Sequence, residues 1–175
     1  MKKILTLTAA VFAAALLSAQ AKLKVGATPV PHAEMLNLVK DDLKAQGVDI
    51  QVIEMTDYVI LNDALESGEL DANFDQHIPY MESTNKEKGY HLVNAGGIHI
   101  EPIALYSKKV SKLSDLKKKA TIAIPNDPTN GGRALLLLQA AGLIELKKDA
   151  GITATTLDIA KNPLKLKFKE LDAAS

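Results

Sequence analysis

The chain has 175 residues, 47% of them hydrophobic and 24% charged, a composition that can bury a core in one domain or in two small lobes. Its formal net charge is zero, and only 4% of its residues are aromatic, with no tryptophan. Nucleic-acid binding is therefore not expected, because it needs a basic surface and aromatic stacking platforms. Without cysteine, the chain forms neither disulfides nor thiolate metal sites.

Residues 1–21 have the pattern of a signal peptide. Two lysines precede the apolar run 4–17, and residues 19–21 match a small-x-small cleavage site. We therefore expect export to the periplasm, with Lys22 as the first residue of the mature chain. Residues 17–19 resemble the segment that precedes a lipid-bearing cysteine, but Gln20 stands where that cysteine would be. No lipid attachment is therefore expected at that position.

The next part of the chain predicts alternating strands and helices. Residues 22–28 and 48–54 have strand patterns, and residues 33–46 have apolar side chains at helical spacing before a glycine. A further short helix is predicted over residues 64–67. Two β-α-β units indicate a mostly parallel sheet with helices on its faces and ligands at the carboxyl ends of its strands.

Residues 71–80 form a dense polar stretch that is a candidate for ligand binding. His77 and Tyr80 are three residues apart, so one helical turn would place them on the same face. Each joins an apolar body to a hydrogen-bonding tip, which suits a pocket for a small polar ligand. The alternative is that His77 caps a helix and Tyr80 packs in the core.

Residues 90–93 and 98–106 have strand patterns, and the second run is expected to connect a first lobe to a second. A helix is expected to start near Ser114 and to end in the exposed lysine run 117–119. His91 and His99 match no compact metal motif with His77 or Glu101, so no metal site is expected.

The most informative stretch is residues 121–133, which predict a buried strand, a polar loop and the start of a helix. Thr129 or Asn130 is expected to cap that helix, and the two following glycines allow close backbone approach. Arg133 is placed in the first turn, where a positive side chain opposes the helix dipole unless it holds an anion. It is a candidate clamp for a carboxylate or phosphate, and the alternative is a solvated surface arginine.

The last part of the chain predicts a short helix or turn over residues 143–151, a strand-like run over residues 152–159 and a half-buried strand over residues 164–170. In that last strand, apolar side chains alternate with lysines. No nucleophile elbow, phosphate loop or paired catalytic carboxylates occur, so the chain is expected to be neither an enzyme nor a cofactor protein.

The chain resembles the substrate-binding component of bacterial methionine ABC importers, a family of periplasmic proteins usually tethered as lipoproteins. The resemblance runs over residues 24–171. It is carried by residues 56–65 (TDYVILNDAL), 68–73 (GELDAN), 76–80 (QHIPY), 102–109 (PIALYSKK), 124–130 (IPNDPTN), 132–139 (GRALLLLQ) and 157–163 (LDIAKNP).

This resemblance implies an α/β fold of the periplasmic-binding-protein type, with two lobes of mostly parallel sheet that close over one amino acid. The first lobe is expected to span residues 22–105, and residues 106–175 to form part of the second lobe. By its motifs, Arg133 is implied to hold the carboxylate of L-methionine and Asn130 to bond its polar end. Tyr58, His77 and Tyr80 are implied to line the pocket around the thioether.

Three departures from the family pattern shape the functional expectation. The lipid-bearing cysteine is replaced by Gln20, an aromatic commonly found before the Gln-His pair is replaced by Asp75, and family chains are substantially longer. The expected function is methionine capture for the membrane permease subunits of an ABC importer, by a monomer in the periplasm, with weak binding by a truncated product. A different amino acid, a short peptide, a metal ion, or a non-transport role for an exported remnant remains an alternative.

Overall fold

A computed structural model describes residues 22–173, so the predicted signal peptide lies outside the described residues. The chain divides into two compact units, the first ending at Asp75 and the second beginning at Gln76. The predicted boundary between a first and a second lobe after residue 105 is a separate expectation and stays a prediction. No helix among residues 22–173 has the length and apolar composition needed to cross a membrane.

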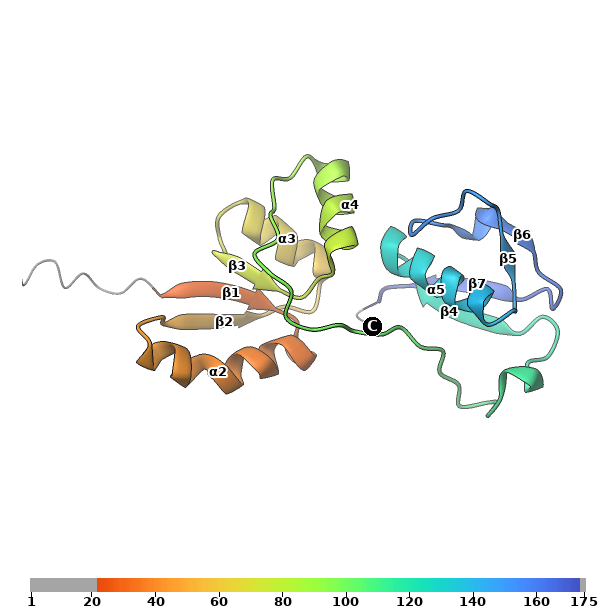
Figure 1. Cartoon of the computed structure of the whole chain (residues 1–175), viewed down its shortest axis with the longest axis horizontal. Helices are drawn as coiled ribbons and strands as arrows, with labels where there is room; N and C mark the ends of the chain where they lie inside the picture. The colour runs from red at the N-terminus through yellow and green to blue at the C-terminus, as the bar shows by residue number, and fades with distance from the viewer. Residues whose placement is uncertain (1–21, 174–175) are drawn as a thin grey trace, which may run out of the picture. The chain divides into compact units, whose positions relative to one another are not determined.

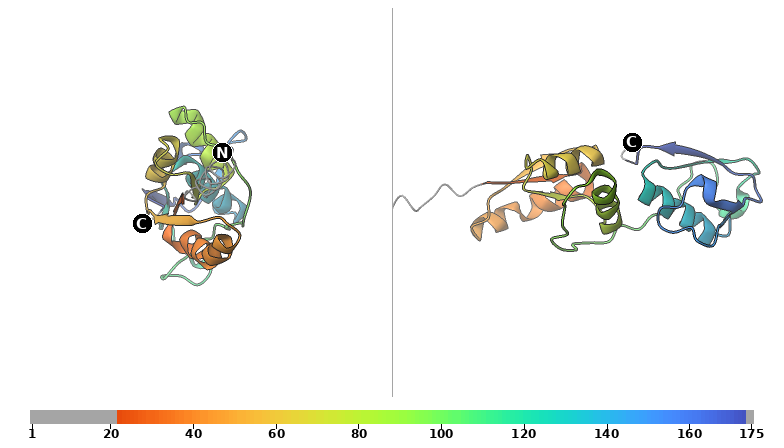
Figure 2. Two further views of the ribbon diagram at one scale, coloured as in Figure 1. Left: turned by 90° about the vertical axis from the view of Figure 1, so that its left-hand side faces the viewer. Right: turned by 90° about the horizontal axis from the view of Figure 1, so that it is seen from above.

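The first unit contains a three-stranded parallel sheet made of β1 (Leu23–Ala27), β2 (Ile50–Glu54) and β3 (Ala72–Phe74). The strand order is β2-β1-β3. An irregular turn, η1 (Pro29–Ala33), leads into α2 (Glu34–Ala45), and α3 (Tyr58–Glu66) follows β2. Because β2 and β3 lie on opposite sides of β1, right-handed crossovers place α2 and α3 on opposite faces of the sheet (Figures 1 and 2).

The helix predicted over residues 64–67 is longer than expected, because α3 begins at Tyr58. Asp57 caps it, and its Oδ1 accepts hydrogen bonds from the backbone N–H groups of Val59 at 2.8 Å and Ile60 at 3.2 Å. Leu61 of α3 is fully buried and packs against Leu70, forming a small core with Ala64. The β-branched residues of the first turn favoured a strand locally, and the cap and this packing overrode that preference.

The predicted amphipathic helix over residues 33–46 is confirmed as α2, but its apolar residues are not deeply buried. No residue of α2 is fully buried, and the side chain of Leu38 is 81% exposed. A helix in a globular protein gains most of its stability from burying one face. The first unit therefore holds α2 with less burial than its sequence pattern predicts.

The second unit begins with α4 (Ile78–Lys88) and contains α5 (Pro128–Ala140), which contacts α4. β4 (Thr121–Pro125) pairs in parallel with β7 (Lys167–Leu171), and β5 (Glu145–Leu146) pairs in antiparallel with β6 (Ile159–Lys161). Two single turns, η2 (Leu113–Asp115) and η3 (Thr156–Asp158), complete the unit. Its core is formed by apolar residues of these elements, among them Ile122, Ile124, Leu135, Leu138, Leu146 and Leu166.

Two strands and one helix predicted before β4 are wrong. Residues 90–93 and 98–106 belong to no strand or helix of the described chain, and Ile100 is 91% exposed. A strand pattern needs a partner edge to become a strand, and alternation alone does not supply one. Lys118 and Lys119 lie in a turn, where Lys119 adopts a positive φ of 65°. The helical turn before them is η2.

The predictions after α5 are partly wrong. Residues 143–151 contain the short strand β5 in place of a helix or turn alone, and residues 152–159 contain η3 in place of most of the predicted strand. The strand predicted over residues 164–170 is confirmed in its second half, because β7 begins at Lys167. Lys165 has a positive φ of 50°, which is incompatible with a strand and delays its start.

Candidate functional site

The loop between β4 and α5 is organised by Asp127. Its Oδ1 accepts hydrogen bonds from the backbone N–H of Asn130 at 2.8 Å and from the hydroxyl of Thr129 at 3.2 Å. Asp127 is therefore the cap of α5, and the prediction of Thr129 or Asn130 as the cap is wrong. Pro128 explains the difference, because proline favours the first helical position and so assigns the cap to the residue before it.

The side chain of Asn130 connects this cap to Arg133. Asn130 Nδ2 donates to Asp127 Oδ2 at 3.1 Å. This bond orients the side-chain amide so that the Oδ1 of Asn130 faces Arg133. Arg133 Nη1 donates to that oxygen at 2.9 Å, and Arg133 Nη2 donates to the backbone carbonyl of Glu101 at 2.8 Å. Two groups thus hold the guanidinium in place while other N–H donors remain for a ligand.

Arg133 lies in the second turn of α5, because the helix begins at Pro128, so its placement in the first turn was wrong. The close backbone approach predicted for the two glycines before it is confirmed. A Cβ on Gly132 would lie 1.8 Å from the carbonyl oxygen of Ile152, and a Cβ on Gly131 would lie 2.9 Å from that of Pro125. The glycines therefore allow the start of α5 to lie against neighbouring backbone.

The start of α4 brings His77 and Tyr80 together. His77 occupies the cap position but makes no capping hydrogen bond, and its ring centroid lies 6.3 Å from that of the buried Tyr80. Burial lowers the pKa of His77, the charge of Arg133 lowers it further, and Asp127 and Glu101 act in the opposite direction. The imidazole is therefore neutral near pH 7, and its Nε2 is buried without a hydrogen-bond partner in the structure.

Asp75 and Tyr58 belong to the first unit. Tyr58 is the half-buried first residue of α3. Asp75 follows β3, and its Oδ1 is buried without a hydrogen-bond partner. Burial raises the pKa of Asp75 from 3.8 to about 7, because desolvation disfavours the ionised carboxylate.

The structure thus brings four of the five predicted site residues, His77, Tyr80, Asn130 and Arg133, into one unit, with Tyr58 in the other. Two contributors were not predicted. Asp127 had a recognisable signal, since an acidic residue before a proline is typical of a helix start. The backbone carbonyl of Glu101 had none, because any residue supplies such an oxygen.

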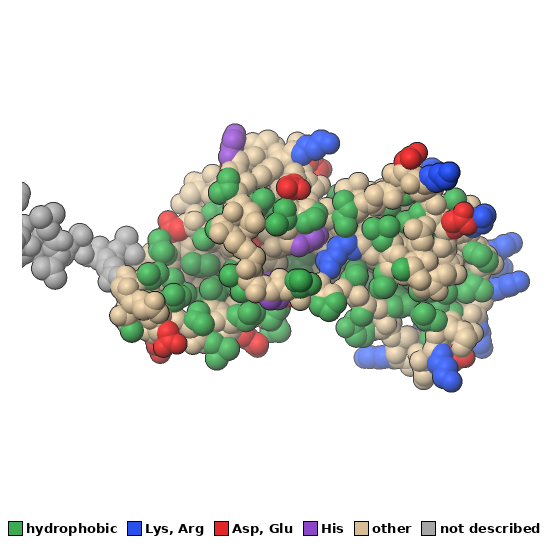
Figure 3. Space-filling view, in the orientation of Figure 1, with side chains coloured by type: hydrophobic (Ala, Val, Ile, Leu, Met, Phe, Trp, Pro, Cys, Tyr) green, Lys and Arg blue, Asp and Glu red, His purple; other side chains and the backbone are tan. Residues whose placement is uncertain are grey.

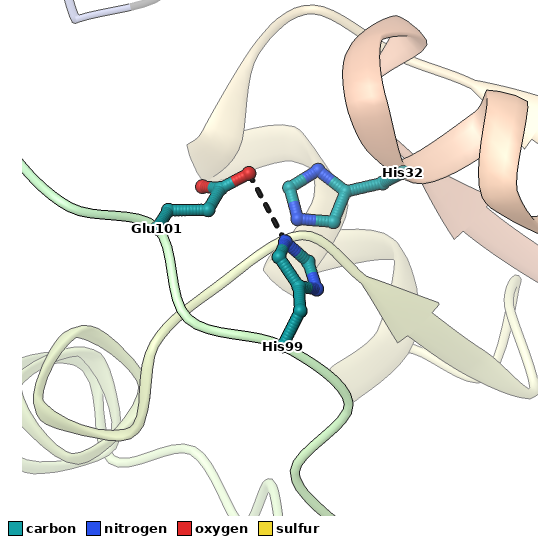
Figure 4. A group of neighbouring side chains, drawn as sticks. All are labelled: His32, His99 and Glu101. Carbon is teal, nitrogen blue, oxygen red and sulfur yellow. Dashed lines mark hydrogen bonds and ion pairs between the residues drawn. The ribbon is translucent and has the colours of Figure 1, made fainter.

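Two further histidines, His32 and His99, have partners of their own. His99 Nε2 lies 3.1 Å from Glu101 Oε1, and the two side chains form an ion pair when the imidazole is protonated (Figure 4). In the first unit, His32 is buried, with its Nδ1 2.6 Å from the hydroxyl oxygen of Thr28 and its ring edge-on to Phe74.

Comparison with known proteins identifies the chain's relatives. Residues 23–175 match the NlpA lipoprotein family. The chain is 50% identical over 127 residues to the D-methionine-binding lipoprotein MetQ of Salmonella typhimurium, a match that covers 73% of this chain and 47% of that protein. It is 45% identical over 153 residues to outer membrane lipoprotein 3 of Mannheimia haemolytica, covering 87% of this chain and 58% of that protein. The chain thus spans about half the length of these curated relatives.

Solved structures show the same relationship. A nutrient-binding protein from Burkholderia cenocepacia bound to methionine matches with a TM-score of 0.83 and 50% identity, over 86% of this chain and 64% of that one. A periplasmic substrate-binding protein of an ABC transporter from Coxiella burnetii matches with a TM-score of 0.80 and 43% identity, over 86% and 64% of the two chains. The described units thus have the α/β fold of periplasmic binding proteins, and the chain belongs to the NlpA lipoprotein family.

Proposed function

We propose that this chain binds methionine as the substrate-binding component of an ABC importer, and that Arg133 holds the carboxylate of the ligand. The observation that carries this proposal is the restraint of Arg133 by Asn130 and the Glu101 carbonyl. A guanidinium held in one orientation binds a carboxylate through paired, charge-assisted hydrogen bonds at a reduced entropic cost. The similarity to the methionine-bound Burkholderia protein supports an amino acid as the source of that carboxylate.

The other predicted residues fit the remaining parts of the ligand. The neutral imidazole of His77 offers a buried Nε2 that lacks a partner, and it can donate or accept a hydrogen bond according to its tautomer. Tyr80 beside it supplies a ring against which a thioether packs well. Tyr58 of the first unit stays a predicted ligand contact, as the family resemblance implies.

The proposed partners are the membrane permease subunits of the importer, which receive methionine from the binding protein in the periplasm. The relatives' names identify them as lipoproteins, and the matched Salmonella protein is named for D-methionine. L-methionine is the proposed ligand, and titration of both enantiomers decides between them. Binding without catalysis is proposed because the site combines anion-holding and apolar groups with no paired nucleophile and base.

Calorimetric titration of the purified chain with L-methionine, D-methionine and L-methioninol tests the proposal. We expect methionine to bind, because the held guanidinium of Arg133 can offer its remaining N–H donors to the ligand carboxylate. L-methioninol, which lacks the carboxylate, should not bind measurably.

Arg133 is the only arginine in the sequence, so its replacement removes the one guanidinium. We expect Arg133→Ala to weaken methionine binding by about 2 kcal/mol or more, because a charge-assisted hydrogen-bonded pair is lost. Lys148→Ala, which removes an exposed positive charge elsewhere in the same unit, should leave the affinity unchanged. Equal affinities of wild type and Arg133→Ala, or equal binding of methionine and methioninol, would refute the assigned role of Arg133.

A further inference from the structure

Exposed lysines gather at the amino-terminal end of the β4–β7 sheet in the second unit. They come from two segments that lie side by side, the turn before β4 and the approach to β7 with β7 itself. Lys119 N–H donates to the carbonyl of Leu164 at 2.8 Å, and Lys167 N–H donates to that of Ala120 at 2.9 Å. We call the following exposed residues the lysine patch: Lys117, Lys118, Lys119, Lys165, Lys167 and Lys169.

The β7 members of the lysine patch share one face of the sheet. Lys167 and Lys169 alternate with Phe168, which packs against the core, so their side chains point to the outer face. The register places them opposite two exposed, uncharged residues of β4, Thr121 and Ala123. This outer face is therefore positive, with no carboxylate of either strand on it.

The charge of the lysine patch is not neutralised within residues 22–173. Other lysines of the unit form ion pairs, Lys147 with Asp158 at 3.6 Å and Lys161 with Glu145 at 2.6 Å, and no ion pair among the described residues includes a member of the patch. The second unit holds 15 basic against 10 acidic residues, a net charge of +5. Figure 3 shows basic side chains gathered over the region of β5, β6 and β7.

Hydrogen bonds hold the backbone of the lysine patch in place. Lys119 and Lys165 have φ values of 65° and 50°, the only positive values for non-glycine residues in the described part of the chain. This conformation is unfavourable for a residue with a Cβ, so the surroundings must enforce it. Asn162 does so beside Lys165, because its Nδ2 donates to the carbonyl of Leu166 at 2.9 Å and its Oδ1 accepts from the Leu166 N–H at 2.8 Å.

We propose that the lysine patch binds the surface of a membrane that contains anionic phospholipids. A lysine is a compact charge on a flexible stem, which suits a diffuse negative surface better than the two-point recognition of one anion. Nucleic acid fits less well, because the patch offers no aromatic side chain for stacking. The chain belongs to a lipoprotein family and has the pattern of an exported protein, so a membrane surface is the anionic partner that it meets.

The lysine patch is separate from the candidate ligand site. It lies at the amino ends of β4 and β7, whereas the loop that leads to Arg133 follows the carboxyl end of β4. Membrane binding through the patch therefore leaves the surroundings of Arg133 uncovered, and the proposal does not rest on methionine binding.

The test uses the chain from Lys22 onward, the expected product of signal-peptide cleavage, so that the apolar run 4–17 cannot itself bind lipid. Co-sedimentation measures its binding to vesicles of phosphatidylcholine alone and of phosphatidylcholine with an equal part of phosphatidylglycerol. We expect binding only to the vesicles with phosphatidylglycerol at about 0.05 M salt, and loss of that binding at about 0.5 M salt, where the charges are screened.

The double variant Lys118→Gln with Lys167→Gln removes one charge from each segment of the patch. It should weaken vesicle binding by about fivefold for each lysine, or roughly 25-fold for both. The matched control is Lys86→Gln with Lys108→Gln, which removes two exposed charges from the same unit outside the patch and should bind vesicles within about twofold of wild type. Lys117→Gln with Lys169→Gln is the second test variant if circular dichroism shows that the first is partly unfolded.

Three results would overturn the proposal. Equal binding to both kinds of vesicle would show that anionic headgroups are not recognised. Equal losses in the patch variant and in the control variant would show that only the net charge of the unit matters. Self-association at low salt that the patch variant abolishes, without vesicle binding, would show that the partner is the acidic surface of a second copy.

Discussion

Replacing Asp75 by asparagine should change how the stability of the protein depends on pH. Burial raises the pKa of Asp75 from 3.8 to about 7 in the folded chain, and its Oδ1 has no hydrogen-bond partner in the structure. Asparagine keeps the shape of the side chain but cannot ionise. The difference in unfolding free energy between wild type and variant therefore isolates the carboxyl group.

The sign and size of the effect follow from the two pKa values. Between pH 4 and 7 the unfolded chain has lost the Asp75 proton and the folded chain retains it, so the stability from this group falls as pH rises. Each pKa unit corresponds to about 1.4 kcal/mol, and the shift from 3.8 to about 7 gives a total loss of about 4 kcal/mol. Water that enters the half-buried site on ionisation lowers this figure.

Urea denaturation of both proteins at half-unit pH steps from 4 to 8 provides the measurement. We expect the wild type to lose stability relative to Asp75→Asn across this range and to show no further relative change above about pH 7.5. His77 has a lowered pKa and so destabilises the folded state as pH falls, but it is present in both proteins and cancels in the difference. Parallel pH profiles of the two proteins would refute the assignment of a neutral, buried Asp75.

Two further predictions concern α5 and its surroundings. Gly132→Ala should destabilise the chain by about 3 kcal/mol in urea unfolding, because its Cβ would lie 1.8 Å from the carbonyl oxygen of Ile152. Gly151→Ala, whose Cβ would meet nothing within 4 Å, should change stability by less than about 0.5 kcal/mol, and an equal effect of both alanines would contradict the close approach. Asp127→Ala should cost about 1–2 kcal/mol of stability and should also weaken methionine binding, because Asn130 loses its partner. Asp127→Ser should restore the stability measured by thermal unfolding, because serine also caps a helix, but it should not restore the affinity measured by calorimetry. Recovery of both would show that methionine binding does not depend on the orientation of the Asn130 side chain.

Local signals accounted for the elements whose sequence patterns agree with their surroundings. The strand and helix around residues 121–140 were predicted because a β-branched run, a proline and a terminal glycine each act within a few residues. The segment over residues 98–106 was mispredicted as a strand, because strand formation needs a partner edge that a local pattern cannot reveal. The cap of α5 was misassigned although the Asp-Pro signal was present.

The sequence alone was enough to predict the α/β class, the polar loop before α5 and the residue types of the candidate site, because propensity, capping and motif spacing are local properties. The tertiary structure decided which of those residues act together. It placed the carbonyl of Glu101 against Arg133 and lowered the pKa of His77. Each of these outcomes depends on desolvation or on contacts between distant segments, and chain packing determines both.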